Sequence, residues 1–493
     1  MDLSSWLERR ADFTPDRSAI HFEGSDYSWA ALARQMRQLA GALAAQGIGR
    51  GDPIAHLGYN SPLFLVLLFA CARLGAMLVP LNWRLAAPEH RVVIADAEPK
   101  LLVHDAGFAQ AAARLGAART LSLDALAAAL PAASEREADP AASYALPLLI
   151  VYTSGTTGRP KGAVLTQEAL LWNAVNSTVM HDLTSADHVL TTLPMFHVGG
   201  LNIQTLPALH AGASVTLHPR FDADATLTAI AERRPSLAVL VPAQLAALIA
   251  HPAWAQTDLS CLRAITTGSS IVPTPLIEAI HARGVPVIQV YGSTETAPIA
   301  IYQTPRDAFL SVGSCGKPAL HCAARIVDGE GRDVPRGARG EILVRGPNVM
   351  SFYWRNPEAS AAALRDGWFH TGDIGHVDER GYYFIDERKH DVIIAGGENI
   401  YPAEVEAILL AEPRIAEAAV VARPDPRWGE VPVAVIVLRP GAAMAAAEVL
   451  ALFHEKIARF KQPRDVVFAA ALPKNALGKV LRYELRRQVA AQG

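Results

Sequence analysis

A run of small and hydroxyl-bearing residues between two apolar segments could bind phosphate. It reads Tyr152-Thr-Ser-Gly-Thr-Thr-Gly-Arg-Pro-Lys-Gly162, and the flanking segments 148–152 and 162–165 are predicted strands. Glycines permit backbone angles that turn several N–H groups toward one anion, while hydroxyls and a lysine add donors and charge. It is not a Walker A loop, because Lys161 is followed by glycine instead of Ser or Thr. The candidate phosphate ligands are Thr153, Ser154, Gly155, Thr156, Thr157, Gly158 and Lys161.

A second motif, Tyr291-Gly-Ser-Thr-Glu-Thr296, follows a predicted buried strand. Its side chains are therefore expected at the carboxyl end of a strand, where α/β sheets bind ligands. Tyr291 could stack on a base, Thr294 could hydrogen-bond a phosphate or carboxylate oxygen, and Glu295 is a hard oxygen ligand suited to Mg²⁺. A polar loop with a helix-capping Thr is the structural alternative, and this motif alone does not decide between them.

Three weaker motifs lie in the last third of the chain. In Trp368-Phe-His-Thr-Gly-Asp373 a carboxylate after a glycine turn could accept both ribose hydroxyls, although Gly-Asp is also an ordinary turn pair. The glycine pair Gly396-Gly397, before a helix opened by Pro402, permits close backbone approach to a ligand. Lys479 follows a glycine turn near the C-terminus, where a solvated lysine is the default interpretation.

The elements that must position these groups change in character along the chain. Short apolar runs alternate with helical patterns up to about residue 312, as in doubly wound α/β sheets. Residues 313–387 read as short strands joined by Gly- and Pro-rich turns, which indicates a small β-rich, barrel-like subdomain. The remainder suits an α+β module that includes a helix at 446–458. We therefore predict an N-terminal domain, 1–388, with two α/β subdomains, and a smaller C-terminal α+β domain, 389–493.

Net charge, cysteine spacing and the length of apolar stretches argue against several classes of protein. The 493 residues carry a net charge of −3, so no basic surplus indicates a nucleic-acid partner. The four cysteines lack C-x-x-C spacing, which argues against a metal or disulfide framework and favours a reducing cytoplasm. The most apolar uncharged stretch, 61–72, is too short to span a bilayer and is a predicted buried helix. With no basic and apolar leader at the N-terminus, we expect a cytoplasmic enzyme without membrane insertion.

Taken together, these motifs resemble the core motifs of the adenylate-forming superfamily of acyl-CoA synthetases, adenylation domains and luciferases. The matching segments are 152–162, 291–295, 371–373, Arg388 and 473–479, in the family's order and spacing. The resemblance covers essentially the whole chain and implies two half-reactions. A carboxylate attacks the α-phosphorus of ATP to give an acyl-adenylate and pyrophosphate, and a thiol then displaces AMP. It implies ATP, CoA and a small carboxylic acid as substrates, with Mg²⁺ as cofactor, and leaves a homodimer open.

The resemblance also implies residue roles. Residues 153–161 would hold the β- and γ-phosphates, Glu295 with Thr153 would hold Mg²⁺, and Lys479 would bridge the substrate carboxylate and the α-phosphate. Lysine and Mg²⁺ stabilise the charge that redistributes at phosphorus, and no general base is needed. The nucleoside would be bound by Tyr291, Gly292, Gly268, Ser269, Ser270, Asp373 and Arg388.

Family members rotate the C-terminal domain between the two steps. The hinge position, commonly Asp or Lys, is His390 here. After rotation Gly396 and Gly397 would flank the pantetheine tunnel. Trp428, Phe460 and Lys461 would then contact the CoA nucleotide.

The segment Pro194-Met-Phe-His-Val-Gly-Gly200 resembles the family's acyl-pocket motif, with Phe196 and His197 lining the site and Val241 on its far wall. Amino-acid-activating domains usually carry Asp where this chain has His197, and no arginine near Val241 could pair a second carboxylate. The chain most resembles bacterial feruloyl/aryl and medium-chain acyl-CoA ligases, which predicts an apolar aryl, hydroxycinnamoyl or medium-chain monocarboxylate. Two alternatives stay open: an adenylating enzyme that loads a carrier protein, and a non-catalytic nucleotide-binding relative.

Overall fold

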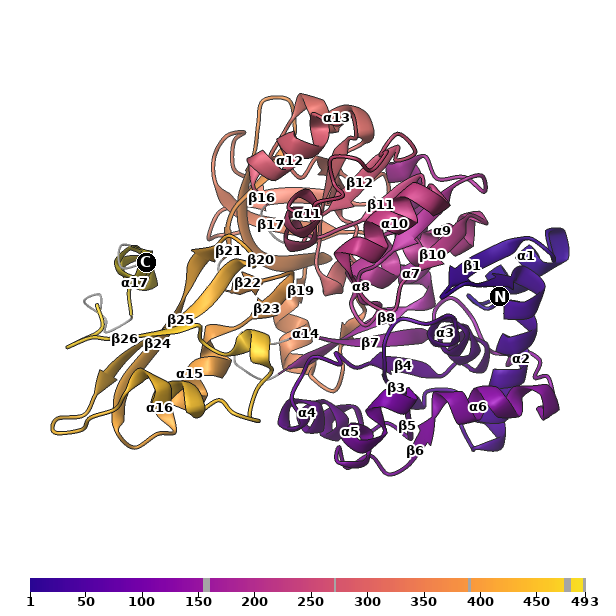
Figure 1. Ribbon diagram of the computed structural model, residues 1–493, viewed down its shortest axis with the longest axis horizontal. Helices are drawn as coiled ribbons and strands as arrows, with labels where there is room; N and C mark the ends of the chain where they lie inside the picture. The colour runs from indigo at the N-terminus through magenta and orange to yellow at the C-terminus, as the bar shows by residue number, and fades with distance from the viewer. Residues whose placement is uncertain (154–159, 270–271, 389–391, 474–479, 491–493) are drawn as a thin grey trace. The chain divides into compact units, whose positions relative to one another are not determined.

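The computed structural model describes residues 1–153, 160–269, 272–388, 392–473 and 480–490 (Figure 1). Several predicted residues lie outside these ranges: Ser154, Gly155, Thr156, Thr157, Gly158, Ser270, His390 and Lys479. For Arg388 only the backbone is described, at the end of a strand. The chain forms two compact units. The first contains residues 1–83, 94–152 and 162–387, and the second contains residues 84–93, 153–161 and 388–493.

A seven-stranded sheet in the order β18-β8-β7-β4-β3-β5-β6 forms one layer of the first unit. Strands β3 to β7 run parallel, and β18 pairs antiparallel with β8. The strands predicted on either side of the glycine-rich loop are confirmed as β7 and β8. The bounds are β3 Pro53–Leu57, β4 Met77–Pro80, β5 Leu101–His104, β6 Thr120–Ser122, β7 Pro147–Thr153, β8 Lys161–Thr166 and β18 Phe352–Tyr353.

A nine-stranded sheet, above the first in the view of Figure 1, has the order β15-β14-β13-β12-β11-β9-β10-β1-β2. Its central strands are parallel, and β2, β14 and β15 run antiparallel at its edges. The bounds are β1 Ser18–Phe22, β2 Ser25–Ser28, β9 His188–Thr191, β10 Ser214–Leu217, β11 Leu237–Val239, β12 Ala264–Thr267, β13 Val287–Tyr291, β14 Ile301–Tyr302 and β15 Lys317–Pro318.

Helices join these strands and share their core. The Ser28 hydroxyl accepts the Ala31 N–H at the start of α2, and the Ser61 hydroxyl caps α3, which ends at the left-handed Gly75. One apolar cluster combines side chains of these helices with side chains of both sheets. The helices longer than five residues are α1 Ser5–Phe13, α2 Trp29–Ala45, α3 Pro62–Leu74, α4 Ala87–Ala97, α6 Leu123–Ala129, α7 Gln167–His181, α9 Leu206–Ala211, α10 Ala223–Arg233, α11 Pro242–Ile249, α12 Thr274–His281, α13 Pro305–Leu310 and α14 Pro357–Ala363.

The predicted β-rich region forms a separate five-stranded sheet. It contains β16 Ala323–Val327, β17 Gly340–Arg345, β19 Leu364–Arg365, β20 Trp368–Val377 and β21 Tyr383–Arg388. One strand of this region departs from the prediction, because β18 leaves it to pair with β8. The predicted class, α/β sheets with a β-rich sheet and a C-terminal α+β part, is confirmed.

The C-terminal part of the second unit has its own sheet and core. The sheet has the order β23-β22-β25-β24, with β26 paired to β25. The helix predicted at 446–458 is wrong beyond Ala451, where α16 ends; Glu455 has φ 58°, and the following chain buries Phe453 and Ile457. The bounds are β22 Ile393–Ala395, β23 Glu398–Ile400, α15 Pro402–Leu410, β24 Ile415–Asp425, β25 Gly429–Leu438, α16 Ala446–Ala451, β26 Asp465–Phe468 and α17 Arg482–Ala490.

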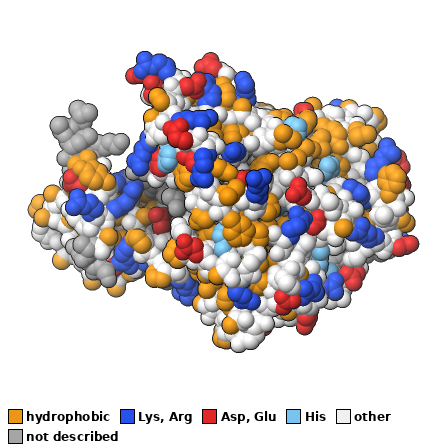
Figure 2. All heavy atoms as spheres, turned by 90° about the horizontal axis from the view of Figure 1, so that it is seen from above, with side chains coloured by type: hydrophobic (Ala, Val, Ile, Leu, Met, Phe, Trp, Pro, Cys, Tyr) orange, Lys and Arg blue, Asp and Glu red, His pale blue; other side chains and the backbone are white. Residues whose placement is uncertain are grey.

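The predicted buried helix at 61–72 is confirmed, since α3 is buried from Phe64 to Leu74. Across the described ranges, no helix combines the length and the apolar character needed to cross a bilayer. On the face shown in Figure 2, Lys and Arg side chains are interspersed with Asp and Glu side chains.

Candidate functional site

The carboxyl ends of the two α/β sheets meet around Asn60. This residue follows β3 of the seven-stranded sheet, and its amide nitrogen donates to the carbonyls of Leu193 and His218, at 2.9 and 3.0 Å. Its amide oxygen accepts the Met195 N–H at 2.7 Å. The accepting segments follow β9 and β10 of the other sheet. One buried side chain therefore fixes the predicted acyl-pocket motif against the neighbouring sheet.

An aromatic cluster lies beside that motif. Phe196 is 7% exposed and contacts His197, with ring centroids 4.7 Å apart. Trp83 meets Phe196 edge to face at 6.3 Å, and Tyr59 meets Trp83 at 4.9 Å. Val241 is also buried, at the start of α11. An apolar and aromatic wall of this kind suits an aromatic ligand.

Tyr291 and Asp373, predicted to bind the nucleoside, lie together. Tyr291 is the last residue of β13, and its phenol donates a 2.8 Å hydrogen bond to the Asp373 carboxylate. Each residue is 9% exposed. A carboxylate held by a neighbouring donor is positioned to accept further hydrogen bonds with its remaining lone pairs.

Asp373 owes its position to a bulge in a strand, where the sequence predicted a turn. Residues 371–373 of β20 oppose only Ile342 of β17, between paired residues on either side. Gly372 takes φ 72°, a left-handed conformation that glycine adopts easily. The Thr371 hydroxyl donates to the Ile342 carbonyl at 2.7 Å and accepts the Asp373 N–H at 3.0 Å. The sequence correctly indicated that the chain bends at Gly372, but it predicted a turn there and not a bulge within a strand.

Glu295, the predicted metal ligand, sits in a short turn of helix after β13. Its carboxylate accepts a 2.7 Å hydrogen bond from the Tyr353 phenol, and it is 9% exposed. Thr294 beside it is half-buried. Carboxylate and hydroxyl oxygens are the donors that Mg²⁺ prefers, so these residues fit the ion. Among the described residues, no three His, Cys, Asp or Glu side chains form a metal-binding group, which leaves Glu295 as a single carboxylate.

The backbone around the predicted adenine site is tightly packed. A Cβ added to Gly292 would meet the Pro298 carbonyl oxygen at 1.6 Å, so the chain requires glycine there. Gly268 directly follows β12, and Ser269 is exposed with φ 70°. The hydroxyl of Thr267, just before Gly268, is buried without a hydrogen-bond partner in the described part of the chain. This strand end therefore offers a donor and acceptor that the protein itself does not use.

The base of the predicted phosphate loop is anchored from outside the motif. The Tyr152 phenol donates to the Asp96 carboxylate, at the end of α4. Burial, reinforced by Asp96, raises the pKa of Tyr152, which keeps its proton on the phenol. The Tyr152 ring also lies against Gly162, where a Cβ would come within 3.0 Å of it. Between the strands, the Thr153 hydroxyl donates to the Lys161 carbonyl at 3.4 Å.

In the second unit, Gly396 and Trp428, two of the residues predicted to bind CoA, lie together. The Gly396 N–H donates to the Trp428 carbonyl at 2.8 Å, and a Cβ on Gly396 would meet the indole ring at 2.8 Å. Gly397 also has a positive φ, 86°. Phe460 is half-buried against the core of this part.

Lys461 has a different setting from the one its predicted role requires. It is 5% exposed, and its ammonium donates to Glu404 at 2.8 Å and to Glu89 at 2.6 Å. Although burial opposes the charged form, the two carboxylates raise the pKa of Lys461. A direct contact with the CoA nucleotide would require the ammonium to leave these carboxylates, so that role stays a prediction.

Sequence reasoning missed five contributors: Tyr59, Asn60, Trp83, Asp96 and Tyr353. The first three could have been found, because they follow the predicted strands β3 and β4 at their carboxyl ends. Asp96 and Tyr353 gave no such signal. Asp96 contacts the base of the phosphate loop, and Tyr353 contacts Glu295, because folding brings together segments that are far apart in the chain.

Comparison with known proteins agrees with this geometry. Residues 7–354 match the family model described as AMP-binding enzyme, and residues 404–479 match the model described as AMP-binding enzyme C-terminal domain. The chain belongs to the AMP-binding enzyme family. The indoleacetate–CoA ligase of Aromatoleum aromaticum is 55% identical over 502 residues, covering 99% of this chain and 98% of that protein. The feruloyl-CoA synthase of an Amycolatopsis species is 42% identical over 486 residues, covering 99% of each.

A solved structure supports the same assignment for this AMP-binding enzyme. The o-succinylbenzoate CoA synthetase of Bacillus subtilis, bound with a product analogue, matches with a TM-score of 0.90 and 34% identity, over 98% of each chain. The protein is thus an acid–thiol ligase in the acyl-CoA synthetase branch of the adenylate-forming superfamily.

Proposed function

We propose that this ligase activates an aryl or arylalkyl monocarboxylic acid with ATP and transfers the acyl group to CoA. In the first step a carboxylate oxygen bonds to the α-phosphorus while the bond to the β-phosphate breaks and pyrophosphate leaves. In the second step the CoA sulfur bonds to the acyl carbon, the bond from that carbon to the AMP oxygen breaks, AMP leaves, and the thiol proton passes to solvent.

The main support for an aromatic substrate is the cluster of Tyr59, Trp83, Phe196 and His197 beside the acyl-pocket motif. Flat aromatic walls favour a planar ring through edge-to-face and offset contacts, each worth about 0.5–1.5 kcal/mol. Two similar proteins are named for indoleacetate and ferulate, both aromatic acids. No arginine lies in the segment from Val241 to Leu245, which disfavours a second carboxylate.

The remaining roles are those that the resemblance to the adenylate-forming superfamily implies. Residues 153–161 would hold the pyrophosphate part of ATP, Tyr291 with Asp373 would bind the nucleoside, and Lys479 would join the two reactants. Mg²⁺, held by Glu295 and by nucleotide phosphates, would supply positive charge that offsets repulsion between carboxylate and triphosphate. Binding both reactants in one orientation supplies the proximity that the first step needs.

A panel of acids tests this proposal by pyrophosphate release, with and without CoA. We expect indole-3-acetate, phenylacetate and ferulate to exceed octanoate in kcat/KM, and 2-succinylbenzoate to be poor. Release without CoA should stop near one equivalent of enzyme, because the adenylate remains bound. A preference for octanoate would contradict the proposal of an aromatic substrate. Turnover with a carrier protein but not with CoA would contradict the proposal that CoA accepts the acyl group.

A variant pair links the panel to the cluster. Trp83→Leu should lower kcat/KM for the best aromatic acid by about tenfold and leave octanoate within about twofold, since one aromatic pair contributes up to about 1.5 kcal/mol. Trp254→Leu, half-buried beside a different core, is the matched control and should change neither.

A homodimer and the lack of a nucleic-acid partner stay predictions, which light scattering and an electrophoretic shift assay with random-sequence DNA would check.

A further inference from the structure

A cavity of about 430 Å³ opens at the edge of the nine-stranded sheet opposite the ligase site. His188 and Ser214, which line it, are the first residues of the parallel strands β9 and β10, and Ser18 begins β1 beside them. The predicted acyl and nucleoside residues instead follow the last residues of β9, β12 and β13. At about 3.3 Å per residue, a four-residue strand separates the two edges by on the order of 10 Å. The cavity is therefore no part of the ligase site.

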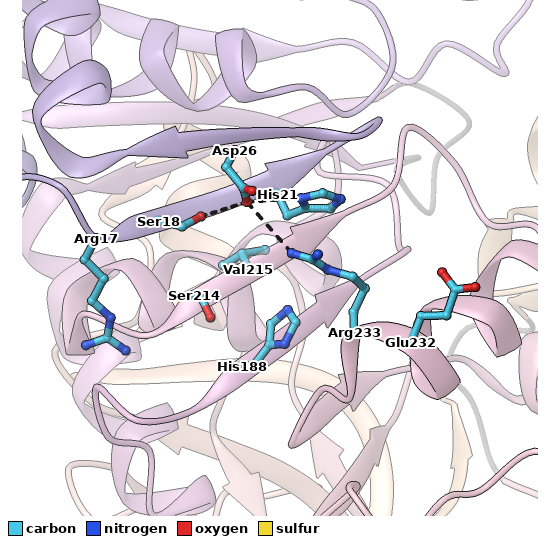
Figure 3. Close-up of a pocket in the computed structure, with 9 residues that line it drawn as sticks. All are labelled: Arg17, Ser18, His21, Asp26, His188, Ser214, Val215, Glu232 and Arg233. Atoms are coloured by element: carbon cyan, nitrogen blue, oxygen red, sulfur yellow. Dashed lines mark hydrogen bonds and ion pairs between the residues drawn. The ribbon is translucent and has the colours of Figure 1, made fainter.

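Nitrogen and hydroxyl donors face this cavity from several elements (Figure 3). Arg17 approaches from the segment before β1, and Arg233 from the end of α10, on the opposite side of the drawn cluster. His21 stands on β1 near Arg233, and the Ser214 hydroxyl lies between the two sides. One guanidinium nitrogen of Arg17 donates to the Ser185 carbonyl, which holds that side chain in place.

The negative charge in the cavity is concentrated on one carboxylate. Asp26 accepts from Ser18 at 3.0 Å, contacts His21 Nδ1 at 3.1 Å, and lies 3.8 Å from Arg233. The hydrogen bond from His21 lowers the pKa of Asp26, so this carboxylate stays ionised. Glu232 also lines the cavity, but in Figure 3 its carboxylate points away from Arg17 and His188.

His188 forms a neutral part of the cavity wall. Its Nε2 lies 2.7 Å from the Thr216 hydroxyl. Burial lowers the pKa of His188, and the charges of Arg233 and His21 act in the same direction. Arg17 and Arg233 supply permanent positive charge to the cavity, and Asp26 lies near Arg233.

We propose that this cavity is a second binding site, for the phosphate group of a small molecule. Guanidinium groups on opposite sides can donate to different oxygens of a tetrahedral anion, which accepts from many directions. A phosphate group presents its oxygens in more directions than a planar carboxylate does, which suits donors that approach from different sides. The Ser214 hydroxyl, which lies between the two sides, is placed to add a donor. The cavity exceeds the size of one phosphate ion, so the phosphate can be free, part of pyrophosphate, or carried by a phosphomonoester.

Calorimetric titration of the full-length protein tests the site, with inorganic phosphate, pyrophosphate and AMP as separate probes. We expect saturable phosphate binding in the wild type. The double variant Arg17→Gln/Arg233→Gln should bind at least about tenfold more weakly, since each hydrogen bond with a charged partner contributes about 1.5–3 kcal/mol. Asp26→Asn should bind about threefold more tightly, because it removes the carboxylate that competes for Arg233. Pyrophosphate and AMP are both products of the proposed reaction and would also bind the ligase site, so only the binding that the double variant loses is assigned to the cavity. Loss of pyrophosphate binding would identify a diphosphate as the ligand, and loss of AMP binding a phosphomonoester.

Arg234→Gln is the matched control, because Arg234 is the adjacent exposed arginine and pairs with Asp258 outside the cavity. It should bind phosphate as the wild type does, and thermal melting should show all variants folded. Steady-state ligase kinetics of the double variant should match the wild type, which separates this proposal from the proposed function. Phosphate affinity unchanged in the double variant, or no saturable wild-type binding at tens of millimolar phosphate, would overturn it.

Discussion

The phenol of Tyr291 donates a 2.8 Å hydrogen bond to the carboxylate of Asp373, although 82 residues separate them in the chain. It joins the end of a central strand in the nine-stranded sheet to the bulge in β20. Because Asp373 is predicted to accept the ribose hydroxyls, the hydrogen bond would orient that carboxylate before ATP arrives. Tyr291 is then a positioning residue as well as a surface for the base.

We expect Tyr291→Phe to raise KM for ATP by about threefold to tenfold and to change kcat by less than about twofold. The ring that stacks on the base is kept, and Asp373 remains but is no longer oriented, so ATP binding loses only part of the roughly 1.5–3 kcal/mol that a hydrogen bond with a charged partner contributes. Tyr383→Phe is the matched control, because that buried phenol bonds to the Ala324 carbonyl at 2.9 Å within the β-rich sheet. Equal KM values in Tyr291→Phe and wild type would contradict the orienting role.

Tyr152→Phe should weaken ATP binding through the base of the phosphate loop. The substitution removes the donor to Asp96 but keeps the ring that packs against Gly162. We expect KM for ATP to rise at least about threefold, with KM for the acid unchanged. Asp96→Asn, which can still accept the hydrogen bond, should retain most of the affinity. If both variants lose ATP affinity equally, the charge of Asp96 matters as well as the hydrogen bond, and an unchanged KM for ATP in Tyr152→Phe would contradict this anchoring role.

Sequence predicted those parts of the site that local patterns encode. The loop between β7 and β8, the capped helix α2 and the strand before Tyr291 all follow from residues close together in the chain. Pairs such as Tyr353 with Glu295 were not predictable, because they depend on strand order. Phe352 and Tyr353 read as part of the β-rich region, yet β18 pairs with β8, more than 180 residues earlier. The apolar spacing at 446–458 predicted one continuous helix, which is wrong beyond Ala451. Phe453 and Ile457 are buried there without a continuous helix.

Substitutions of the two motif lysines, Lys161 and Lys479, should change different kinetic parameters. Lys479→Ala should lower kcat for ATP–pyrophosphate exchange by about 10²–10³, as expected for a group that stabilises charge at the reacting centre. Lys161→Ala should mainly raise KM for ATP, because it holds the leaving phosphates. Lys474→Ala, from the same motif as Lys479, is the control and should leave exchange within about twofold. Undiminished exchange in Lys479→Ala would refute the assignment of that lysine.

Glu295→Gln should shift the dependence on magnesium. The amide keeps the size of the side chain and can still accept from Tyr353, but it loses the charge that binds a divalent cation. We expect the Mg²⁺ concentration for half-maximal exchange to rise at least about tenfold, with partial recovery at high Mg²⁺. Glu341→Gln, a half-buried carboxylate near the bulge, is the control. The same Mg²⁺ dependence in wild type and Glu295→Gln would exclude Glu295 as the ligand.

The buried imidazole of His181 should make the first unit less stable in acid. Its Nε2 lies 2.8 Å from the Thr266 hydroxyl, and its Nδ1 lies 2.9 Å from the Ser177 carbonyl. Burial lowers the pKa of His181 from its ordinary value of 6.5 to about 4. Between these values the unfolded chain binds the proton more readily than the folded protein does. The stability contribution is therefore complete above pH 6.5 and is lost as the pH falls toward 4.

Urea unfolding of wild type and His181→Gln at several pH values checks this dependence. The wild type should lose stability on the order of 3 kcal/mol more than the variant across that window, because one pKa unit corresponds to about 1.36 kcal/mol. Burial also lowers the pKa of His188, His210, His218 and His281, but these groups contribute equally to both proteins. His454→Gln, at an exposed position, should follow the wild type. Parallel pH profiles for wild type and His181→Gln would mean that the pKa of this imidazole is not lowered in the folded protein.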